Sequence, residues 1–468
     1  MLNQISVIAA MLTTSGLLQV GHGSLAALLI QQGQRLEFSA TTLGFLTSAS
    51  YVGFIAGIFL QRRLLPRISF IRTFAVCAAA LSVLAIIMAI LPNEWVWMVV
   101  RFMHGLFFSV ALVVCEGWIN ARANNENRSR LMGLFIAVNY MGYGLSQYIL
   151  LLGVGWPDKA FLAATAFLII SMVPVCLTRF AEPQAPPRDD GGSMSFMEAY
   201  RVAPVSFLGQ VGFGFVTGAG WLFVAYLSGL EVSAEEGATL AVIFYGAGFI
   251  LQVPMGWLAD HLPDRRDLLG ILAGISALLA GVLFFGPQLS SGILMFLIFA
   301  YGSVSSPLFS LNIAYGQSFV AREKSADYSF RLFQGYAWGA LIGPPLAGFL
   351  MGAISPSMLF ALIAVTFAAI AGITATDRLM PKYRPVKTEN VPVVSPLLAS
   401  QAITEEIMYN EFDIGPDLPA KEAVEITDSP AEIGPNLPEQ ESPPAAEAAE
   451  EFVGPLSPEG DLAAEGKV

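Results

Sequence analysis

Residues 238–266 have the sequence ATLAVIFYGAGFILQVPMGWLADHLPDRR, in which a long apolar run is followed at once by a dense cluster of charges. The run at 238–258 carries no charged side chain. A membrane-spanning helix needs about 20 mostly apolar residues, and this run meets that requirement. The acids and arginines of 260–266 are expected at a membrane interface, because a charge at mid-membrane costs several kcal/mol. The stretch therefore predicts a transmembrane helix that ends in a short charged loop.

The composition of the whole chain agrees with this prediction. Of its 468 residues, 55% are hydrophobic and only 13% are charged, and the mean hydropathy is +0.63. Such a chain is too apolar for a soluble globular protein. Half of the acidic residues but only two basic ones lie from Thr388 onward, so the acidic balance belongs to the tail.

Twelve stretches are long and apolar enough to span a membrane, and we therefore predict an all-α membrane protein with twelve transmembrane helices. They are residues 5–30, 40–61, 72–92, 95–119, 131–154, 158–179, 204–229, 237–258, 268–287, 291–317, 329–353 and 356–376.

The organisation of these stretches predicts two six-helix pseudo-repeats, at 1–180 and 204–387. A linker rich in proline, glycine and charges separates them at 181–203. Gly142 and Gly339 lie at corresponding places in the fifth and eleventh stretches, as expected for parallel repeats. Residues 388–468 are dominated by Pro, Ala, Glu and Gly and are predicted to be a disordered, acidic, cytoplasmic tail.

Basic residues gather in the loops on one side of the predicted bundle. The opposite side holds only Arg35 and Lys159. By the positive-inside rule, we expect both termini and the linker on the cytoplasmic side of the membrane. The membrane itself is expected to be the inner (plasma) membrane of a bacterial cell.

The charged loop at 256–266 follows the pattern Gly-x-x-x-Asp-x-x-x-Asp-Arg-Arg, which resembles the loop signature of the major facilitator superfamily. The resemblance implies that the glycine lets two helices approach closely. It also implies that the Asp and Arg side chains pair across a junction between helices that opens and closes. A partial copy follows the second stretch, where Gln61 stands in the place of the acid. An ordinary charged turn between two spans is the alternative. The matching residues are Gly256, Asp260, Asp264, Arg265 and Arg266, with Gly57, Arg62 and Arg63 in the first half.

Glu116 is the only carboxylate well inside an apolar run. A buried acid needs a partner, so we expect it to pair with Arg128 or Arg130 across the following loop and to help close an inner gate. A proton-carrying acid is the alternative.

Three further ionisable residues, His22, Arg101 and His104, lie inside apolar runs, where such groups are rare and usually functional. Arg101 and His104 share one helix face, and His22 is expected at a similar depth. The resemblance implies that the first and fourth helices face a central cavity. Our hypothesis is a basic cluster that binds an anionic or strongly hydrogen-bonding solute. Alternatively, Arg101 and Gly105 match an Arg-x-x-x-Gly pattern of the superfamily, which implies a role in folding or proton coupling.

Several polar and aromatic side chains are further candidates for the cavity wall, although helix packing is the default role for each. We include Gln19, Asn139, Gln147, Trp221 and Asn312 in the predicted binding site and regard Tyr140, Gln210, Tyr245, Gln252, Gln334 and Trp338 as additional candidates.

The sequence contains no nucleotide-binding loop, metal cluster or nucleophile constellation, so we predict neither an enzyme nor a cofactor. Nucleic acid is not an expected partner. We predict a monomer in lipid that works as a secondary transporter by alternating access, driven by a proton or solute gradient, for a polar or anionic solute. A multidrug-type efflux carrier and a non-transporting sensor or scaffold on the same fold are the alternatives.

Overall fold

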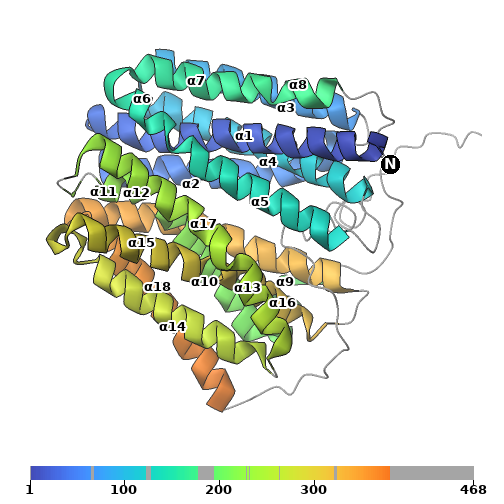
Figure 1. Cartoon of the computed structure of the whole chain (residues 1–468), viewed down its shortest axis with the longest axis vertical. Coiled ribbons are helices and arrows are strands. Elements are labelled where there is room, and N and C mark those ends of the chain that lie inside the picture. The colour runs from blue at the N-terminus through green and yellow to red at the C-terminus, as the bar shows by residue number, and fades with distance from the viewer. Residues whose placement is uncertain are drawn as a thin grey trace, which may run out of the picture. The chain divides into compact units, whose positions relative to one another are not determined.

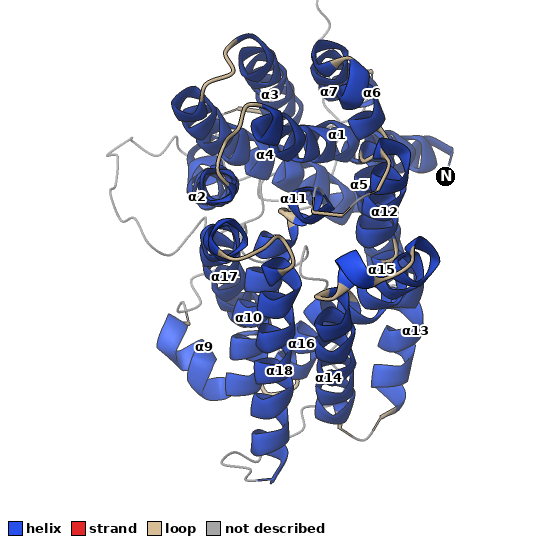
Figure 2. Cartoon of the chain, turned by 90° about the vertical axis from the view of Figure 1, so that its left-hand side faces the viewer, coloured by secondary structure: helices blue, strands red, loops and turns tan. Residues whose placement is uncertain are grey.

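The computed structural model describes residues 2–64, 68–122, 128–177, 194–227, 229–230, 232–262, 264–320 and 324–379. Within these ranges the regular structure is helical, without strands (Figures 1 and 2). The predicted all-α class is therefore confirmed. The predicted linker falls mostly, and the predicted tail entirely, outside the described residues, so that division of the chain stays a prediction.

The helices follow the predicted apolar stretches closely. In the first half they are α1 (Leu2–Arg35), α2 (Ala40–Leu64), α3 (Phe70–Ile90), α4 (Glu94–Arg122), α5 (Arg128–Ser146), α6 (Ile149–Gly155), α7 (Pro157–Ile170) and α8 (Met172–Cys176). In the second half they are α9 (Phe196–Val202), α10 (Pro204–Gly220), α11 (Phe223–Leu227), α12 (Ala234–Gly246), α13 (Gly248–His261), α14 (Arg265–Leu283), the short 3₁₀ helix η1 (Gly286–Gln288), α15 (Ser291–Ser305), α16 (Pro307–Gln317), α17 (Ser325–Ala353) and α18 (Met358–Leu379).

Among the described residues, nine helical stretches are long and apolar enough to cross a membrane, or ten when the bent pair α9–α10 is counted as one. Neither α1 nor α17 is among them. Both are nevertheless long enough to cross a membrane, with 34 and 29 residues. The count of twelve crossings thus stays a prediction, whereas the membrane character is clear.

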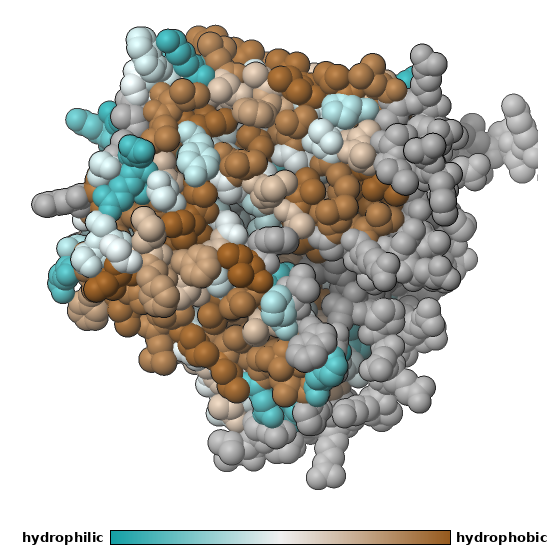
Figure 3. All heavy atoms as spheres, in the orientation of Figure 1, coloured by the Kyte–Doolittle hydropathy of each residue, from teal (hydrophilic) through white to brown (hydrophobic). Residues whose placement is uncertain are grey.

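The outer surface of the bundle is apolar, as a lipid-facing surface must be. Large hydrophobic side chains such as Val76, Leu162, Leu278, Phe296 and Val365 are each more than half exposed. Figure 3 shows such residues covering most of the visible surface of the described helices. A soluble monomer rarely exposes such large apolar patches, so the chain is an integral membrane protein.

The helix pairs repeat between the two halves. In the first half α1 packs on α5, and in the second half α10 packs on α17. The two predicted equivalent glycines lie at these two crossings: Gly142 abuts the backbone of Gly16, and Gly339 abuts that of Val211. The halves meet through α2 with α17 and through α5 with α12, which are also equivalent pairs. This arrangement confirms the parallel pseudo-repeat.

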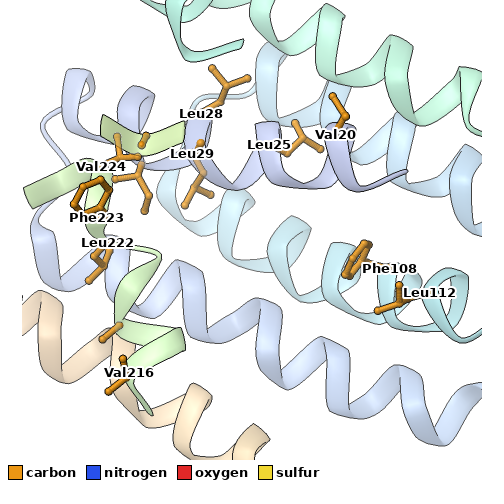
Figure 4. Close-up of a cluster of buried hydrophobic side chains, with 14 of the residues drawn as sticks. Val20, Leu25, Leu28, Leu29, Phe108, Leu112, Val216, Leu222, Phe223 and Val224 are labelled. Atoms are coloured by element: carbon orange, nitrogen blue, oxygen red, sulfur yellow. The ribbon is translucent and has the colours of Figure 1, made fainter. Parts of the chain in front are cut away.

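The two halves touch most closely at one end of the bundle. We call the end where α2 ends and α14 begins the basic end, and the end where α1 ends and α2 begins the far end. At the far end, Gly348 of α17 abuts the backbone of Ala40, and the Ser48 hydroxyl donates to the Leu341 carbonyl oxygen at 2.6 Å. Leu29 of α1 and Phe223 of α11 are fully buried where those two helices meet (Figure 4). Apolar and backbone contacts therefore seal the far end.

Candidate functional site

A cavity of about 620 Å³ lies between the two halves. Its wall extends from Tyr51 and Trp221, toward the far end, to Ala259 and Arg265 at the basic end. The Trp221 Nε1–H donates to the Tyr51 hydroxyl oxygen at 2.8 Å, which joins the halves on the far side of the cavity. This volume lies within the range of small-molecule binding sites, about 300–1,000 Å³.

Arg101 of α4 lines this cavity and is 3% exposed. Its Nε and Nη1 atoms have no hydrogen-bond partner among the described residues. The groups that interact with it electrostatically include the hydroxyls of Tyr143 and Tyr51, and none of the described carboxylates forms an ion pair with it. A buried guanidinium without a counter-charge is costly, and it is well suited to bind an anion.

The two predicted histidines lie beside Arg101 in an aromatic stack. The His22 ring stacks on Phe108, with 3.5 Å between centroids and 7° between planes, and its centroid is 5.0 Å from that of His104. His22 lines the cavity, whereas His104 lies behind it and is fully buried. The structure thus brings the three predicted basic residues together, with Arg101 and His22 at the cavity wall.

The five other predicted binding residues divide into two groups. Gln19, Asn139 and Trp221 line the cavity. Gln147 and Asn312 do not line it: Gln147 donates to the Ser146 hydroxyl at 2.9 Å, and Asn312 packs directly against Gly209. These last two residues make the helix-packing contacts that are the default for buried amides.

Asn139 has its own hydrogen bonds within the first half. Its Oδ1 accepts from the Ser15 hydroxyl at 2.8 Å, and its Nδ2 donates to the Phe135 carbonyl oxygen at 2.7 Å. It therefore links α1 to α5 at the cavity wall and offers little to a solute.

The charged loop between α13 and α14 makes its described contacts inside the second half. Arg266 pairs with Asp264 at 2.6 Å and with Asp377 of α18 at 3.0 Å. Arg265 lines the cavity and donates to the Ala314 carbonyl oxygen at 3.2 Å. In this conformation both arginines tie helices of one half together.

The glycines of the two loop copies differ in their surroundings. Gly57 of α2 abuts the backbone of Leu106 in α4, as the resemblance implies, whereas a Cβ at Gly256 would meet no atom within 4 Å. Gly256 lines the cavity instead.

Glu116 is fully buried on α4. The side chains of Asp260, Arg62, Arg63, Arg128 and Arg130 lie outside the described part of the chain, so the gate hypothesis stays a prediction.

Most of the aromatic residues that line the cavity were not predicted from the sequence. Thirteen Phe, Tyr and Trp residues line the cavity. A signal for them was present, because Tyr51 with Phe54, Tyr140 with Tyr143, and Phe333 with Tyr336 are pairs spaced i, i+3, which share one helix face.

Comparisons with known proteins agree with this architecture. The sequence model of the Major Facilitator Superfamily matches residues 6–333. The uncharacterized MFS-type transporter YcaD of Salmonella newport (strain SL254) is 26% identical over 324 residues, which cover 69% of this chain and 83% of that protein. The protein of the same name from Salmonella typhi matches to the same extent.

Two solved structures illustrate the likeness in fold. The nucleoside transporter NupG has a TM-score of 0.64 at 12% identity, covering 81% of this chain and 100% of its own. A bacterial homolog of the human lysosomal transporter Spinster, in an inward-facing and unoccupied conformation, has a TM-score of 0.58 at 16% identity, covering 86% and 97%. The family match over more than half of the sequence shows that the chain belongs to the Major Facilitator Superfamily.

Proposed function

We propose that this protein is a secondary active transporter that carries a small anionic solute by alternating access. Arg101 is the anchor for the negative charge, and the cavity between the two halves is the site that each side of the membrane reaches in turn. Rocking of one six-helix half against the other around a fixed central site is how parallel repeats of this kind transport solutes.

The observation that supports this proposal best is the state of Arg101. It is buried at the cavity wall, two of its nitrogens lack partners, and no described carboxylate neutralises it. An arginine kept only for folding would be expected to hold such a partner, because an unpaired buried charge destabilises a protein by several kcal/mol.

The proposal extends to the orientation of the protein and its energy source. Basic loops at the basic end favour a cytoplasmic location for that end, with the protein in the inner membrane of a bacterial cell. A proton or solute gradient is the proposed driving force, and the His22 imidazole at the cavity wall is the proposed titratable group for proton coupling. The aromatic lining also suits a carrier of amphipathic compounds, and the anion dependence of uptake separates the two functions.

The test uses the full chain in proteoliposomes, with uptake of radiolabelled organic anions measured for each variant. Arg101→Gln is expected to lower uptake about 30-fold or more, because losing one partner of a buried charge pair costs about 2–5 kcal/mol. Arg101→Lys is expected to be impaired as well, since it keeps the charge but loses the planar fork.

Arg72→Gln is the matched control, because it removes an exposed arginine at the start of α3. Its uptake is expected to match that of the unchanged protein. Unchanged anion uptake in Arg101→Gln, with normal protein levels, would contradict the proposal.

A further inference from the structure

We propose that the cavity selects planar aromatic monocarboxylates, with the carboxylate on Arg101 and the ring against the aromatic wall beside it. This inference rests on the proposed function, since it specifies the solute of the same site.

The aromatic wall lines the same cavity as Arg101, and Tyr143 of this wall interacts with Arg101 electrostatically. The ring centroid of Trp221 lies 5.4 Å from that of Tyr143 and 5.7 Å from that of Tyr245. The ring planes of Tyr143 and Trp221 are also perpendicular to that of His22, at 88°, with centroid distances of 5.8 Å and 6.2 Å. The rings thus form one continuous wall next to the unpaired guanidinium.

A second aromatic cluster faces the same cavity, with three rings from the second half and one from the first. Phe333 and Tyr336 are stacked at 5.8 Å, Tyr336 lies 5.2 Å from Phe309, and Phe54 of α2 lies 6.1 Å from Phe333. A flat ring can pack between these two clusters with favourable stacked or edge contacts on both sides. A saturated ring of the same size is thicker and lacks those contacts.

The charge of the site limits the solute to one carboxylate. Among the described side chains that line the cavity, the arginines are Arg101 and Arg265, and none is an acid or a lysine. Arg101 lies seven residues into α4 from the far end, whereas Arg265 begins α14 at the basic end. A second carboxylate on a compact solute therefore cannot reach both arginines and would be buried without a partner, which is unfavourable.

The experiment measures binding of four related compounds to the purified full chain by isothermal titration calorimetry. They are 2-naphthoate, its saturated counterpart decahydro-2-naphthoate, the neutral 2-naphthamide and the dianion 2,6-naphthalenedicarboxylate. We expect 2-naphthoate to bind about tenfold more tightly than each of the others, a difference of about 1.4 kcal/mol. The saturated acid is the sharpest comparison, because it has the same charge and more apolar surface.

Variants of one tryptophan test whether the ring preference arises at the wall. Trp221→Leu is expected to remove the preference for the aromatic over the saturated acid, and Trp221→Phe to retain it. Trp338→Leu is the matched control, since Trp338 is 52% exposed and does not line the cavity.

Two results would overturn the inference. One is equal or tighter binding of decahydro-2-naphthoate, which would show that apolar volume alone decides. The other is the absence of 2-naphthoate binding at millimolar concentration. If one of these results is obtained but a non-aromatic anion is carried in an Arg101-dependent manner, the inference fails while the proposed transport function stands. Uptake that does not depend on Arg101 for any anion would contradict both the inference and the proposed transport function.

Discussion

Gly53 of α2 lies against the backbone of α4 so closely that a Cβ there would overlap the Phe102 carbonyl oxygen. Gly274 of α14 is also inside a long helix, but a Cβ built on it meets no atom within 4 Å. Both glycines carry the same intrinsic cost of about 1 kcal/mol relative to alanine in a helix. The two sites therefore differ only in packing.

We predict opposite effects for alanine at these two positions. Gly53→Ala is expected to lower the free energy of unfolding by about 1–3 kcal/mol, because α2 and α4 must separate. Gly274→Ala is expected to raise it by up to about 1 kcal/mol through helix propensity. Thermal unfolding of the detergent-purified chain, followed by tryptophan fluorescence, measures both. A gain in stability for Gly53→Ala would show that the crossing has room.

Prediction of individual site residues from the sequence was limited by helix rotation. Arg101 and His22 were identified because an ionisable group in an apolar run needs a protein or water environment. Gln147 and Asn312 are also polar residues inside apolar runs, yet their side chains form hydrogen bonds or packing contacts within the bundle. An apolar run does not reveal which helix face meets the cavity, so buried amides in packing contacts look the same in sequence as amides in a binding site.

At the level of helices, the start of α14 is tied to the end of α18. Asp264 caps α14 by accepting from the Arg266 amide at 2.9 Å, and the Arg266 side chain then bridges Asp264 to Asp377. These side chains are partly exposed, and such pairs contribute about 0.2–1 kcal/mol each.

We predict that Asp377→Asn lowers thermal stability slightly without changing anion binding. The ion pair it removes joins two helices of the same half and lies outside the cavity lining. Calorimetric binding and thermal unfolding should be measured together, with Glu37→Gln as the exposed control. A marked change in anion affinity would instead favour a gating role for this cluster.

The helix breaks inside the predicted spans were not foreseen. The span at 291–317 divides into α15 and α16 at Ser306, where Pro307 occupies the first position of α16 and cannot donate a backbone hydrogen bond. Pro254, however, lies inside α13, and Pro344 and Pro345 lie inside α17. A proline in the sequence therefore does not determine by itself whether a span is broken. Packing against the surrounding helices also affects the outcome.

At the scale of the whole molecule, the far end is sealed while the cavity wall continues to the basic end. The parallel repeat that underlies this arrangement was predictable, since glycines at corresponding places imply corresponding helix crossings. The conformation was not predictable, because under the proposed alternating access the same sequence must form each state of the transport cycle. The contacts of the folded chain, such as those at Ser48 and Gly348, show which end is closed.

We predict that a cysteine in the cavity is labelled from the basic end only. Cys176 is exposed and should first be replaced by serine, whereas Cys77 and Cys115 are buried. In that background, Ser310→Cys is expected to react quickly with a membrane-impermeant thiol reagent from the basic side, and Ser48→Cys slowly from either side. Vesicles of both orientations allow the comparison. Fast labelling of Ser48→Cys from the far side would show an open far end.

The unneutralised charge of Arg101 has an electrical consequence. In the proposed transport cycle the empty site carries one positive charge, and a bound monoanion without a co-transported proton brings the sum to zero. Moving one charge through the full membrane potential involves about 2.3 kcal/mol per 100 mV, so voltage acts on the empty carrier and hardly on the loaded one. Exchange of solute for solute should therefore proceed at a rate independent of voltage. Net transport, which requires the empty carrier to return, should depend on the membrane potential.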